Sequence, residues 1–427
     1  MYKNKKLVIA LMAGAMLLTG CGQDTKKLVA DGQQAFLQGD YAKAVELFQK
    51  VSDSGAAEGD LWLGRCYASG KGVSESEKKA FELFQSASTK GNVDATIELA
   101  KCYLDGHGVS GDRVKGRELM EAGAKAGSAE GKATMALWAL DGKVNLPKDS
   151  LLAYVKDAES SGNPAGILAS GRLLAKGIGT ARDIKGAVEK YRKADELGNS
   201  DATVELAYAL YNGAGVDRDP EKAFALFKKA ADDNNASGIA GMGMCYYEGY
   251  GVARNHAKAI DNFKRAEGKN NPAGQWWLGK CYYYGDGVVK SESEGIQLMK
   301  KAANQGYAPA EFSMAYNYEH GIGVPFDREK ALALYTRSAE AGYAPAQTNL
   351  GIIYYRGDLR LAKSEKEAFE WFCRGAEGGD NAAMFNLYKC FMDGIGTEPH
   401  EETAMQWLKN AAEYGNEKAI SILNGTK

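Results

Sequence analysis

The fold of this chain is decided by a stretch that recurs along it, which at residues 278–287 reads Leu278-Gly279-Lys280-Cys281-Tyr282-Tyr283-Tyr284-Gly285-Asp286-Gly287. Leu278 and Tyr282 lie four residues apart and therefore share one face of a helix. Gly279 has no side chain, so a partner helix can approach closely there. The glycines at 285 and 287 then end the helix in a turn. The stretch predicts the first helix of a helical hairpin.

The hairpin is repeated, and its period is visible in the small residue that ends each unit. Successive markers lie 36 residues apart, with one gap of 35 and one of 37. Gly and Asn, the two types found here, tolerate the left-handed backbone conformation that closes a helix. The markers are Gly55, Gly91, Gly127, Gly162, Gly198, Asn234, Asn270, Gly306, Gly342, Gly379 and Gly415.

Each unit carries the same signals in its two helices. The Leu-Gly-x-x-Tyr pattern of the first helix recurs at residues 63–67 and 350–354. A Gly-x-Gly loop follows in most units, and because no strand precedes it, it does not indicate a nucleotide site. The second helix has an alanine and a large residue four positions apart, which we expect to fill the space between the paired helices. These pairs are Ala80 and Phe84, Ala223 and Phe227, Ala259 and Phe263, Ala331 and Tyr335, and Ala368 and Phe372.

This combination resembles the Sel-one-like repeat, a relative of the tetratricopeptide repeat with a longer loop. The resemblance covers residues 56–416 as ten repeats, while residues 27–55 resemble one tetratricopeptide hairpin and residues 417–427 a capping segment. It implies an all-α fold, a right-handed α/α solenoid of stacked helix-turn-helix repeats. Two units depart from the pattern, residues 128–162 without the Gly-x-Gly loop and residues 343–379 with one extra residue.

The N-terminus has the layout of an export signal. Residues 1–20 begin with lysines and continue with an apolar stretch of about 12 residues, too short for the roughly 20 residues of a membrane-spanning helix. Leu18-Thr19-Gly20-Cys21 resembles the lipobox of bacterial lipoproteins, which implies cleavage before Cys21 and acylation of that cysteine, with residues 21–26 as a lipidated tether. By the same resemblance, Gly22 favours sorting to the outer membrane of a Gram-negative cell. We expect a chain anchored in the cell envelope by its acyl chains, facing the periplasm or exposed at the surface.

Charge and cysteine positions exclude other classes. The net charge is −2, and it becomes −5 without the leader's Lys3, Lys5 and Lys6, so nucleic-acid binding is disfavoured. Five of the seven cysteines stand at the same position of different repeats, and helices pack about 8 to 10 Å apart, too far for a disulfide. We therefore predict free thiols and no disulfide. The pair Cys373 and Cys390 stays open, because these residues lie on adjoining helices of successive repeats.

No catalytic or metal constellation stands out. Four histidines, His107, His256, His320 and His400, are scattered among the repeats without ligand spacing. Ser76 and Lys79 have a Ser-x-x-Lys spacing, but the other motifs of β-lactam-active enzymes are missing. We expect no enzyme, no metal and no cofactor.

Binding is the better prediction, because stacked hairpins leave their first helices lining a concave face. By the resemblance to tetratricopeptide arrays, this face is read 6, 10, 13 and 14 residues after each marker. Early repeats carry Arg65, Lys101 and Arg172 there, whereas later repeats are rich in the residue types of interface hot spots. The predicted groove residues are Tyr208, Tyr211, Met244, Tyr247, Trp276, Lys280, Tyr283, Tyr284, Phe312, Tyr316, Tyr355 and Arg356.

One question stays open for these residues. The aromatic stripe could instead serve packing between repeats, while the tyrosines 12 residues after the markers, such as Tyr67, Tyr103 and Tyr246, are assigned to the core.

The predicted function is a monomeric interaction adaptor that holds a partner protein or peptide. A surface-exposed protein that binds a host factor such as immunoglobulin, and a cell-wall or β-lactam-active enzyme, are the alternatives.

Overall fold

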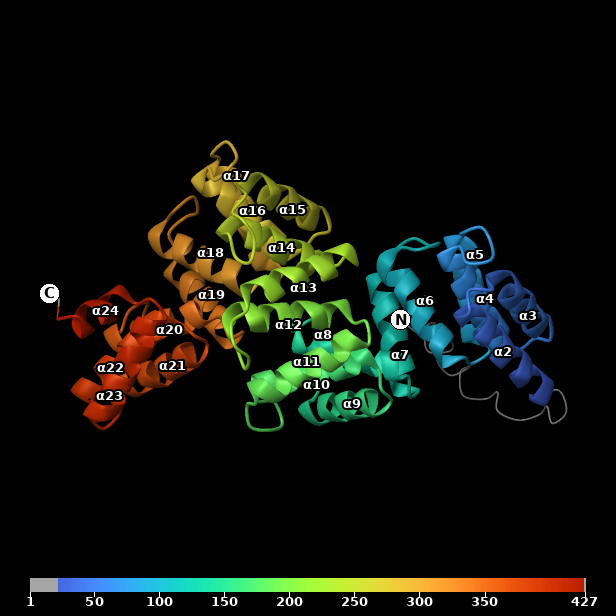
Figure 1. Cartoon of the computed structure of the whole chain (residues 1–427), viewed down its shortest axis with the longest axis horizontal. Coiled ribbons are helices and arrows are strands. Elements are labelled where there is room, and N and C mark those ends of the chain that lie inside the picture. The colour runs from blue at the N-terminus through green and yellow to red at the C-terminus, as the bar shows by residue number, and fades with distance from the viewer. Residues whose placement is uncertain (1–21, 426–427) are drawn as a thin grey trace, which may run out of the picture. The chain divides into compact units, whose positions relative to one another are not determined.

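The computed structural model describes residues 22–425, and these contain helices and no strand (Figure 1). The signal peptide predicted at residues 1–20 and the lipidation site predicted at Cys21 lie outside the described residues. The chain divides into two compact units, residues 22–202 and 203–425 of the described part, and the boundary falls within α12 (Ser200–Asn212). The prediction of an all-α fold of stacked helix-turn-helix repeats is confirmed.

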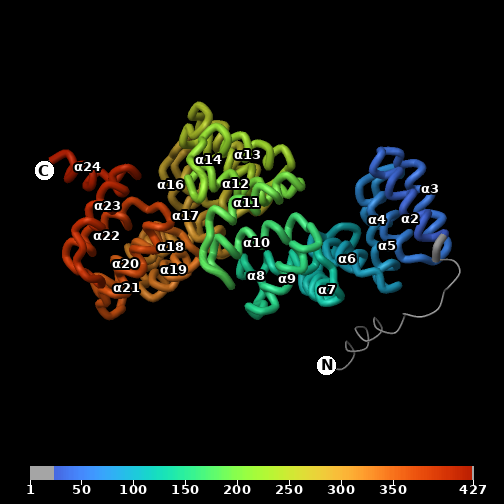
Figure 2. Tube along the Cα trace, turned by 60° about the horizontal axis from the view of Figure 1, so that its bottom comes forward, coloured from blue at the N-terminus to red at the C-terminus, as the bar shows by residue number. Residues whose placement is uncertain are grey.

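The helices follow one another as pairs, and this alternation can be followed along the tube in Figure 2. Unit 1 contains α2 (Gly22–Leu37), α3 (Tyr41–Asp53), α4 (Ala57–Ser69), α5 (Glu77–Thr89), α6 (Val93–Asp105), α7 (Arg113–Lys125), α8 (Ala129–Leu140), α9 (Lys148–Ser160), α10 (Pro164–Lys176) and α11 (Ile184–Glu196). Unit 2 continues with α13 (Pro220–Asp232), α14 (Ala236–Glu248), α15 (His256–Gly268), α16 (Pro272–Tyr284), α17 (Glu292–Asn304), α18 (Ala308–His320), α19 (Arg328–Glu340), α20 (Ala344–Arg356), α21 (Glu365–Glu377), α22 (Asn381–Asp393), α23 (Glu401–Glu413) and α24 (Glu417–Leu423).

The ends of the helices follow from local backbone chemistry. The marker residues have the left-handed conformation that we predicted, including Asn234 and Asn270, whose φ angles are 61° and 57°. An Asp, Asn or Ser side chain opens most helices by accepting a hydrogen bond from the backbone, as Asn271 does from Gly274 N at 2.9 Å. The tether expected at residues 21–26 is helical from Gly22 on, as the first turn of α2. Within the described residues, no helix is long and apolar enough to cross a membrane.

Within a repeat, an aromatic ring lies against bare backbone. A Cβ atom placed on Gly351 would lie 2.6 Å from Cε1 of Phe372, and one on Gly243 would lie 2.7 Å from Cε1 of Phe263. Both rings are buried. In these two repeats, a side chain in place of the glycine would displace the ring that fills the space between the two helices. Other repeats have alanine at the equivalent position, as at Ala207 and Ala315.

Between repeats, the second glycine of the Gly-x-Gly loop makes the closest contact. In four loops, its Cβ position overlaps the carbonyl oxygen of the first residue in the second helix of the preceding repeat. These pairs are Gly72 with Tyr41, Gly108 with Glu77, Gly251 with Pro220 and Gly396 with Glu365. The loop is thus a stacking contact as well as a turn.

The first helices also approach one another directly from repeat to repeat. Such contacts join α8 to α10 in unit 1, and α14 to α16 and α20 to α22 in unit 2. No two second helices of the described chain are joined as extensively. The first helices therefore line the inner side of each unit's curvature, where the predicted groove residues stand.

The extra residue of the repeat at 343–379 is absorbed in an ordered loop. Leu359 and Arg360 have φ angles of 51° and 68°, an unfavourable conformation for residues other than glycine. The Leu359 side chain is buried in a core cluster with Tyr335 and Ile353. Burial of an apolar side chain offsets the backbone strain there.

The cysteines contribute thiols to the core. The structure has Cys66, Cys102, Cys245, Cys281 and Cys390 as buried free thiols, and Cys373 as a half-buried one. Burial raises the pKa of the Cys281 and Cys373 thiols to about 11 and of the Cys245 and Cys390 thiols to about 12. Cys373 packs against the cluster that contains Cys390 without a bond between them.

We predict that Gly251→Ala destabilises the protein more than Gly287→Ala, although both glycines have positive φ angles of 64° and 73°. Alanine costs about 1–2 kcal/mol in either place because of its backbone conformation. At Gly251 the methyl group also meets the Pro220 carbonyl, whereas at Gly287 it meets the movable Cδ1 of Ile260. Thermal unfolding followed by circular dichroism measures the difference, and equal losses would show that the loop can shift away.

We also predict that the buried thiols of the folded protein react slowly with Ellman's reagent at pH 8. A pKa of about 11 leaves about 0.1% thiolate at that pH, against roughly a fifth for an ordinary thiol. Cys373, the half-buried one, should react first. In urea, all six described thiols should react at the ordinary rate.

The raised pKa values of the thiols make the stability of the fold depend on pH. The folded thiols keep their protons at a pH where the unfolded thiols have lost them, so stability is unaffected below pH about 8.5 and falls as the pH rises toward 11. Rapid modification of Cys245 at pH 8 without loss of structure would contradict its burial.

Candidate functional site

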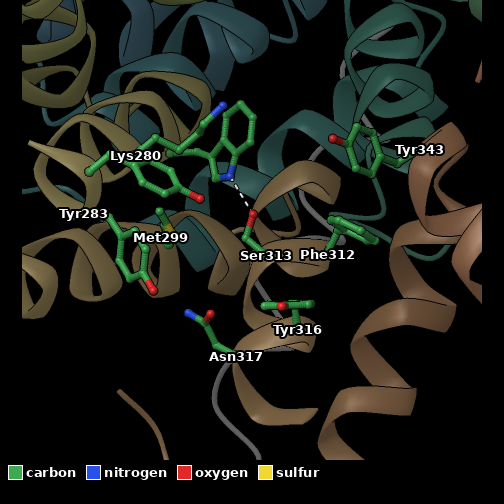
Figure 3. A pocket seen from close by; sticks show the side chains of 10 residues that line it. Lys280, Tyr283, Met299, Phe312, Ser313, Tyr316, Asn317 and Tyr343 are labelled. Carbon is green, nitrogen blue, oxygen red and sulfur yellow. Dashed lines mark hydrogen bonds between the residues drawn. The ribbon is translucent and has the colours of Figure 1, made fainter. Parts of the chain in front are cut away.

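Six of the twelve predicted groove residues converge on one cavity of about 280 Å³ in unit 2. Trp276, Lys280, Tyr283 and Tyr284 come from α16, and Phe312 and Tyr316 come from the facing first helix, α18 (Figure 3). Met299 of α17, Ser313 and Asn317 of α18, and Tyr343 just before α20 complete the lining. These ten residues form what we call the aromatic pocket.

One wall of the pocket is fixed by hydrogen bonds. The Trp276 indole Nε1 donates to the Ser313 hydroxyl at 2.9 Å, and that hydroxyl donates to the Pro309 carbonyl at 2.9 Å. The Lys280 ammonium lies 4.7 Å from the Trp276 ring centre and 4.4 Å from that of Trp277. These contacts hold the indole in place, which lowers the entropy that a bound partner would have to remove.

Other residues of the pocket present aromatic rings to solvent. The Tyr284 side chain is 62% exposed and that of Tyr316 is 48% exposed. Tyr283 lies edge-on to Tyr284 with ring centres 5.0 Å apart, and His320 stacks on Tyr316 at 4.1 Å. Large, rigid and amphipathic side chains that stay exposed are typical of interface hot spots.

Four other predicted groove residues serve the protein itself. Met244 is buried in the core, so its assignment to the groove does not agree with the structure. Tyr208 packs edge-on against Phe227 at 4.9 Å. The hydroxyl of Tyr211 donates to Glu248, and that of Tyr247 donates to Asp286. For these four residues, the packing alternative describes the side chains better than the groove.

Tyr355 and Arg356 line a different cavity of about 700 Å³, near the C-terminal end of unit 2. Its other walls come from α22 and α24, with Asn386, Lys389 and Lys418 among the lining residues. The structure therefore divides the predicted groove into the aromatic pocket, a packed stretch before it and a second, more polar cavity.

Sequence reasoning missed Met299, Ser313, Asn317 and Tyr343. Asn317 and Tyr343 depart from the repeat pattern, and this departure was the signal that could have found them. Tyr343 stands where most first helices have a capping Asn, Asp or Ser, and it makes no side-chain cap. The same holds for Tyr307, which lies 6.1 Å from Trp276. Both repeats continue with Ala-Pro, and proline suits the first turn of a helix because its missing N–H would have no partner there.

The tyrosines that we assigned to the core are mostly half-buried; of Tyr67, Tyr103 and Tyr246, only Tyr103 is buried. Lysines of the second helix cover their outer faces. Lys79, Lys115 and Lys258 lie 5.0, 4.0 and 5.2 Å from the three ring centres. The lysine stem shields the ring while its charge stays in water.

In unit 1, the inner face is charged and satisfied by its own partners. Arg65 pairs with Glu98 at 2.9 Å, Glu98 with Lys101 at 3.2 Å, and Lys101 with Glu130 at 2.5 Å. Arg172 pairs with Asp141 at 3.0 Å. The positive residues that we expected to face a ligand there are engaged along the first helices instead.

The residues considered for catalysis have structural roles. The Ser76 hydroxyl caps α5 by accepting from Lys79 N at 3.4 Å, while the Lys79 ammonium lies over Tyr67. His107 contacts Glu77 at 2.7 Å, and the His400 imidazole caps α23. In the described part of the chain, no group of His, Cys, Asp or Glu side chains could hold a metal ion. The Ser-x-x-Lys spacing is therefore a helix cap.

The sequence model of the family described as Sel1 repeat matches nine stretches of the chain: residues 28–55, 57–92, 93–128, 200–235, 236–271, 272–307, 308–343, 344–380 and 381–416. The first covers the hairpin for which we expected a tetratricopeptide repeat. No stretch between residues 129 and 199 matches, although α8 to α11 form the same pairs.

Several solved structures are similar to this chain. One is a protective antigen of uropathogenic Escherichia coli strains that displays an SLR fold, 30% identical over 88% of this chain and 80% of that one, with a TM-score of 0.38. Another is a Sel1 repeat protein from Oxalobacter formigenes, at 24% identity, 77% and 93% coverage and a TM-score of 0.41. An immunity protein from Pseudomonas aeruginosa is 21% identical over 51% of this chain and 83% of that one, with a TM-score of 0.38.

No curated protein sequence matches the chain. Sel1 repeat solenoids are generally non-catalytic, and they typically mediate interactions between proteins. The repeat matches cover well over half of the residues, and the chain belongs to the Sel1 repeat family.

Proposed function

We propose that this protein is a non-catalytic adaptor of the bacterial cell envelope, anchored by lipid at Cys21, that binds a partner protein or peptide on the inner face of unit 2. The observation that carries the proposal is the aromatic pocket, where α16 and α18 expose the rings of Tyr284 and Tyr316 beside a fixed indole. An exposed cluster of this kind leaves apolar surface in water, and a partner that covers it gains about 25 cal/mol per Å².

The contrast between the two inner faces supports this location. In unit 1, Arg65 and Lys101 already have carboxylate partners, so a ligand would have to replace existing ion pairs. In unit 2, Tyr284 and Tyr316 have exposed rings and gain contacts without losing any. We therefore expect the binding energy to be concentrated in the aromatic pocket.

The double variant Tyr284→Ala and Tyr316→Ala tests the proposal. Each ring is expected to contribute about 2 kcal/mol as a hot spot. Because such contributions are not additive, the double variant should lose affinity between about 30-fold, the effect of one ring, and about 1,000-fold, the sum of both. The measurement is quantitative affinity capture from the envelope fraction of the parent bacterium, with the full-length chain in detergent as bait. Both side chains are largely exposed, so thermal stability should change little.

The matched control removes two aromatic rings elsewhere in unit 2, by Phe326→Ala and Tyr414→Ala, whose side chains are 59% and 46% exposed. A partner retained by wild type and control but lost by the pocket variant supports the proposal. A partner that all three proteins retain equally places the interface elsewhere.

The lipid anchor is a separate part of the proposal, and it rests on the lipobox resemblance of Leu18 to Cys21. Several acyl chains on one residue would hold the protein at a membrane stably, because each buried methylene contributes about 0.8 kcal/mol. The glycine at position 22 favours the outer membrane by the same resemblance.

We predict that cells fed alkyne-palmitate label the wild-type chain and that Cys21→Ser removes both the label and the membrane association. Cys373→Ser is the matched control, since Cys373 is the most accessible of the described thiols and its loss should leave the label unchanged. Label that persists in Cys21→Ser would show that another residue is acylated, and a wild-type chain without label would show that the N-terminal segment is an ordinary export signal.

A further inference from the structure

The polar groups of the aromatic pocket differ in whether they already have partners. The Ser313 hydroxyl is engaged on both sides, by Trp276 and by the Pro309 carbonyl. Asn317 is only 6% exposed, and its amide has one recorded contact within the described chain, a donation to the sulfur of Met314 at 3.9 Å. Sulfur is a weak acceptor, so this buried amide is left with unused hydrogen-bonding capacity at the edge of a cavity.

The place of Asn317 in the repeat makes this unusual. It stands 11 residues after its marker, where the other nine repeats have only apolar side chains or thiols: Cys66, Cys102, Trp138, Leu173, Ala209, Cys245, Cys281, Ile353 and Cys390. A poorly paired amide in a core position costs stability. An amide side chain offers one donor edge and one acceptor edge, which match the N–H and C=O of a peptide backbone.

The charged group of the pocket is Lys280. Within the described residues, its ammonium forms no ion pair with a carboxylate, and acidic groups act on it only from a distance. The nearest acidic groups, Glu248 and Asp286, accept hydrogen bonds from the hydroxyls of Tyr211 and Tyr247. Burial lowers the pKa of Lys280, and these two carboxylates oppose that shift from a distance. No carboxylate lines the cavity itself.

The remaining walls are apolar. Met299, Phe312 and Tyr343 surround a volume of about 280 Å³, at the lower end of the range of small-ligand sites. The cavity has room for one large side chain rather than for a folded domain. Figure 3 shows Lys280 and Asn317 at different edges of the pocket, which an extended ligand would have to span in order to contact both.

We infer that the aromatic pocket binds an extended peptide segment that carries a carboxylate beside a large apolar side chain, which rests on the function proposed above. The Asn317 amide pairs with the peptide backbone, the Lys280 ammonium takes the carboxylate, and the apolar side chain fills the cavity between Met299 and Phe312. The partner is thus recognised by an acidic linear segment.

The test uses fluorescein-labelled peptides in which Gly-Ser flanks surround two variable residues. The first is Glu, Gln or Lys, and the second is Phe, Leu or Ala. Binding to the full-length chain in detergent is measured by fluorescence anisotropy. Glu-Phe and Glu-Leu should bind at least about 10-fold more tightly than their Gln counterparts, because a hydrogen bond to a charged group is roughly twice as strong as a neutral one. Lys and Ala peptides should bind weakest.

Two variants copy residues of sibling repeats and should therefore fold. Lys280→Met introduces the residue found at Met244, and Asn317→Cys introduces the residue found at Cys281. Lys280→Met should remove the preference for Glu over Gln and keep the preference for Phe over Ala. Asn317→Cys should weaken all peptides about 5- to 10-fold and keep both preferences. Lys264→Met, on the exposed side of α15, is the charge-matched control and should change nothing.

Several results would overturn the inference. Equal binding of Glu and Gln peptides, preference for Lys peptides, or a Glu preference that survives Lys280→Met would each do so. If no peptide binds while envelope capture still depends on Tyr284 and Tyr316, an acidic linear segment is rejected and the proposed function stands. If capture does not depend on these tyrosines either, the proposed function fails as well.

Discussion

In several repeats, an aromatic ring of the second helix lies directly on the backbone of a glycine in the first helix and sets the spacing of the two helices. Phe263 on Gly243 and Phe372 on Gly351 occupy the volume that a side chain of the first helix would otherwise fill, and so bring the two helices close together. The second glycine of the loop repeats the principle between units, where Gly251 meets the Pro220 carbonyl. Close packing leaves little room to move in either place, so the repeat length hardly varies. The single extra residue between 343 and 379 is absorbed in a loop with two left-handed residues rather than in a helix.

A scaffold held by these contacts can vary elsewhere. The capping position of the first helix is normally polar, because a side-chain oxygen there satisfies an unpaired backbone N–H and contributes about 1 kcal/mol. Tyr307 and Tyr343 make no such capping hydrogen bond, and the Ala-Pro sequence in the first turn offsets part of the lost stability. Asn317 likewise replaces a core thiol by an amide with one weak partner. These departures from the repeat pattern all lie around the aromatic pocket. There, residues that favour the local fold have been replaced by residues that bring aromatic rings and an amide to the pocket.

The fold could be predicted because its signals repeat. Eleven markers, including Asn234 and Asn270, report the same left-handed residue, and one misread unit would not have changed the result. The pocket was predicted less completely, because an offset rule treats each repeat alone. Met244 and Lys280 occupy equivalent positions, yet Met244 is buried and Lys280 lines the cavity. Tyr211 is engaged by Glu248 of the next repeat, a contact that depends on the stacking geometry and that no pattern within one repeat contains.

The first helices line the inner face in both units, but their side chains differ in whether they already have partners. In unit 1, Arg65, Glu98, Lys101 and Glu130 pair with one another, and a partner that bound there would have to replace these part-buried ion pairs. In unit 2, the nearest acids to Lys280 are engaged by tyrosine hydroxyls, which leaves the cation in contact with indole rings and without an ion-pair partner. A carboxylate supplied by a partner would attract this half-buried cation more strongly than in bulk water, because the effective dielectric constant is lower there. The partner that we propose for unit 2 would thus be selected by charge as well as by apolar contact, because no acidic residue of the described chain pairs with Lys280.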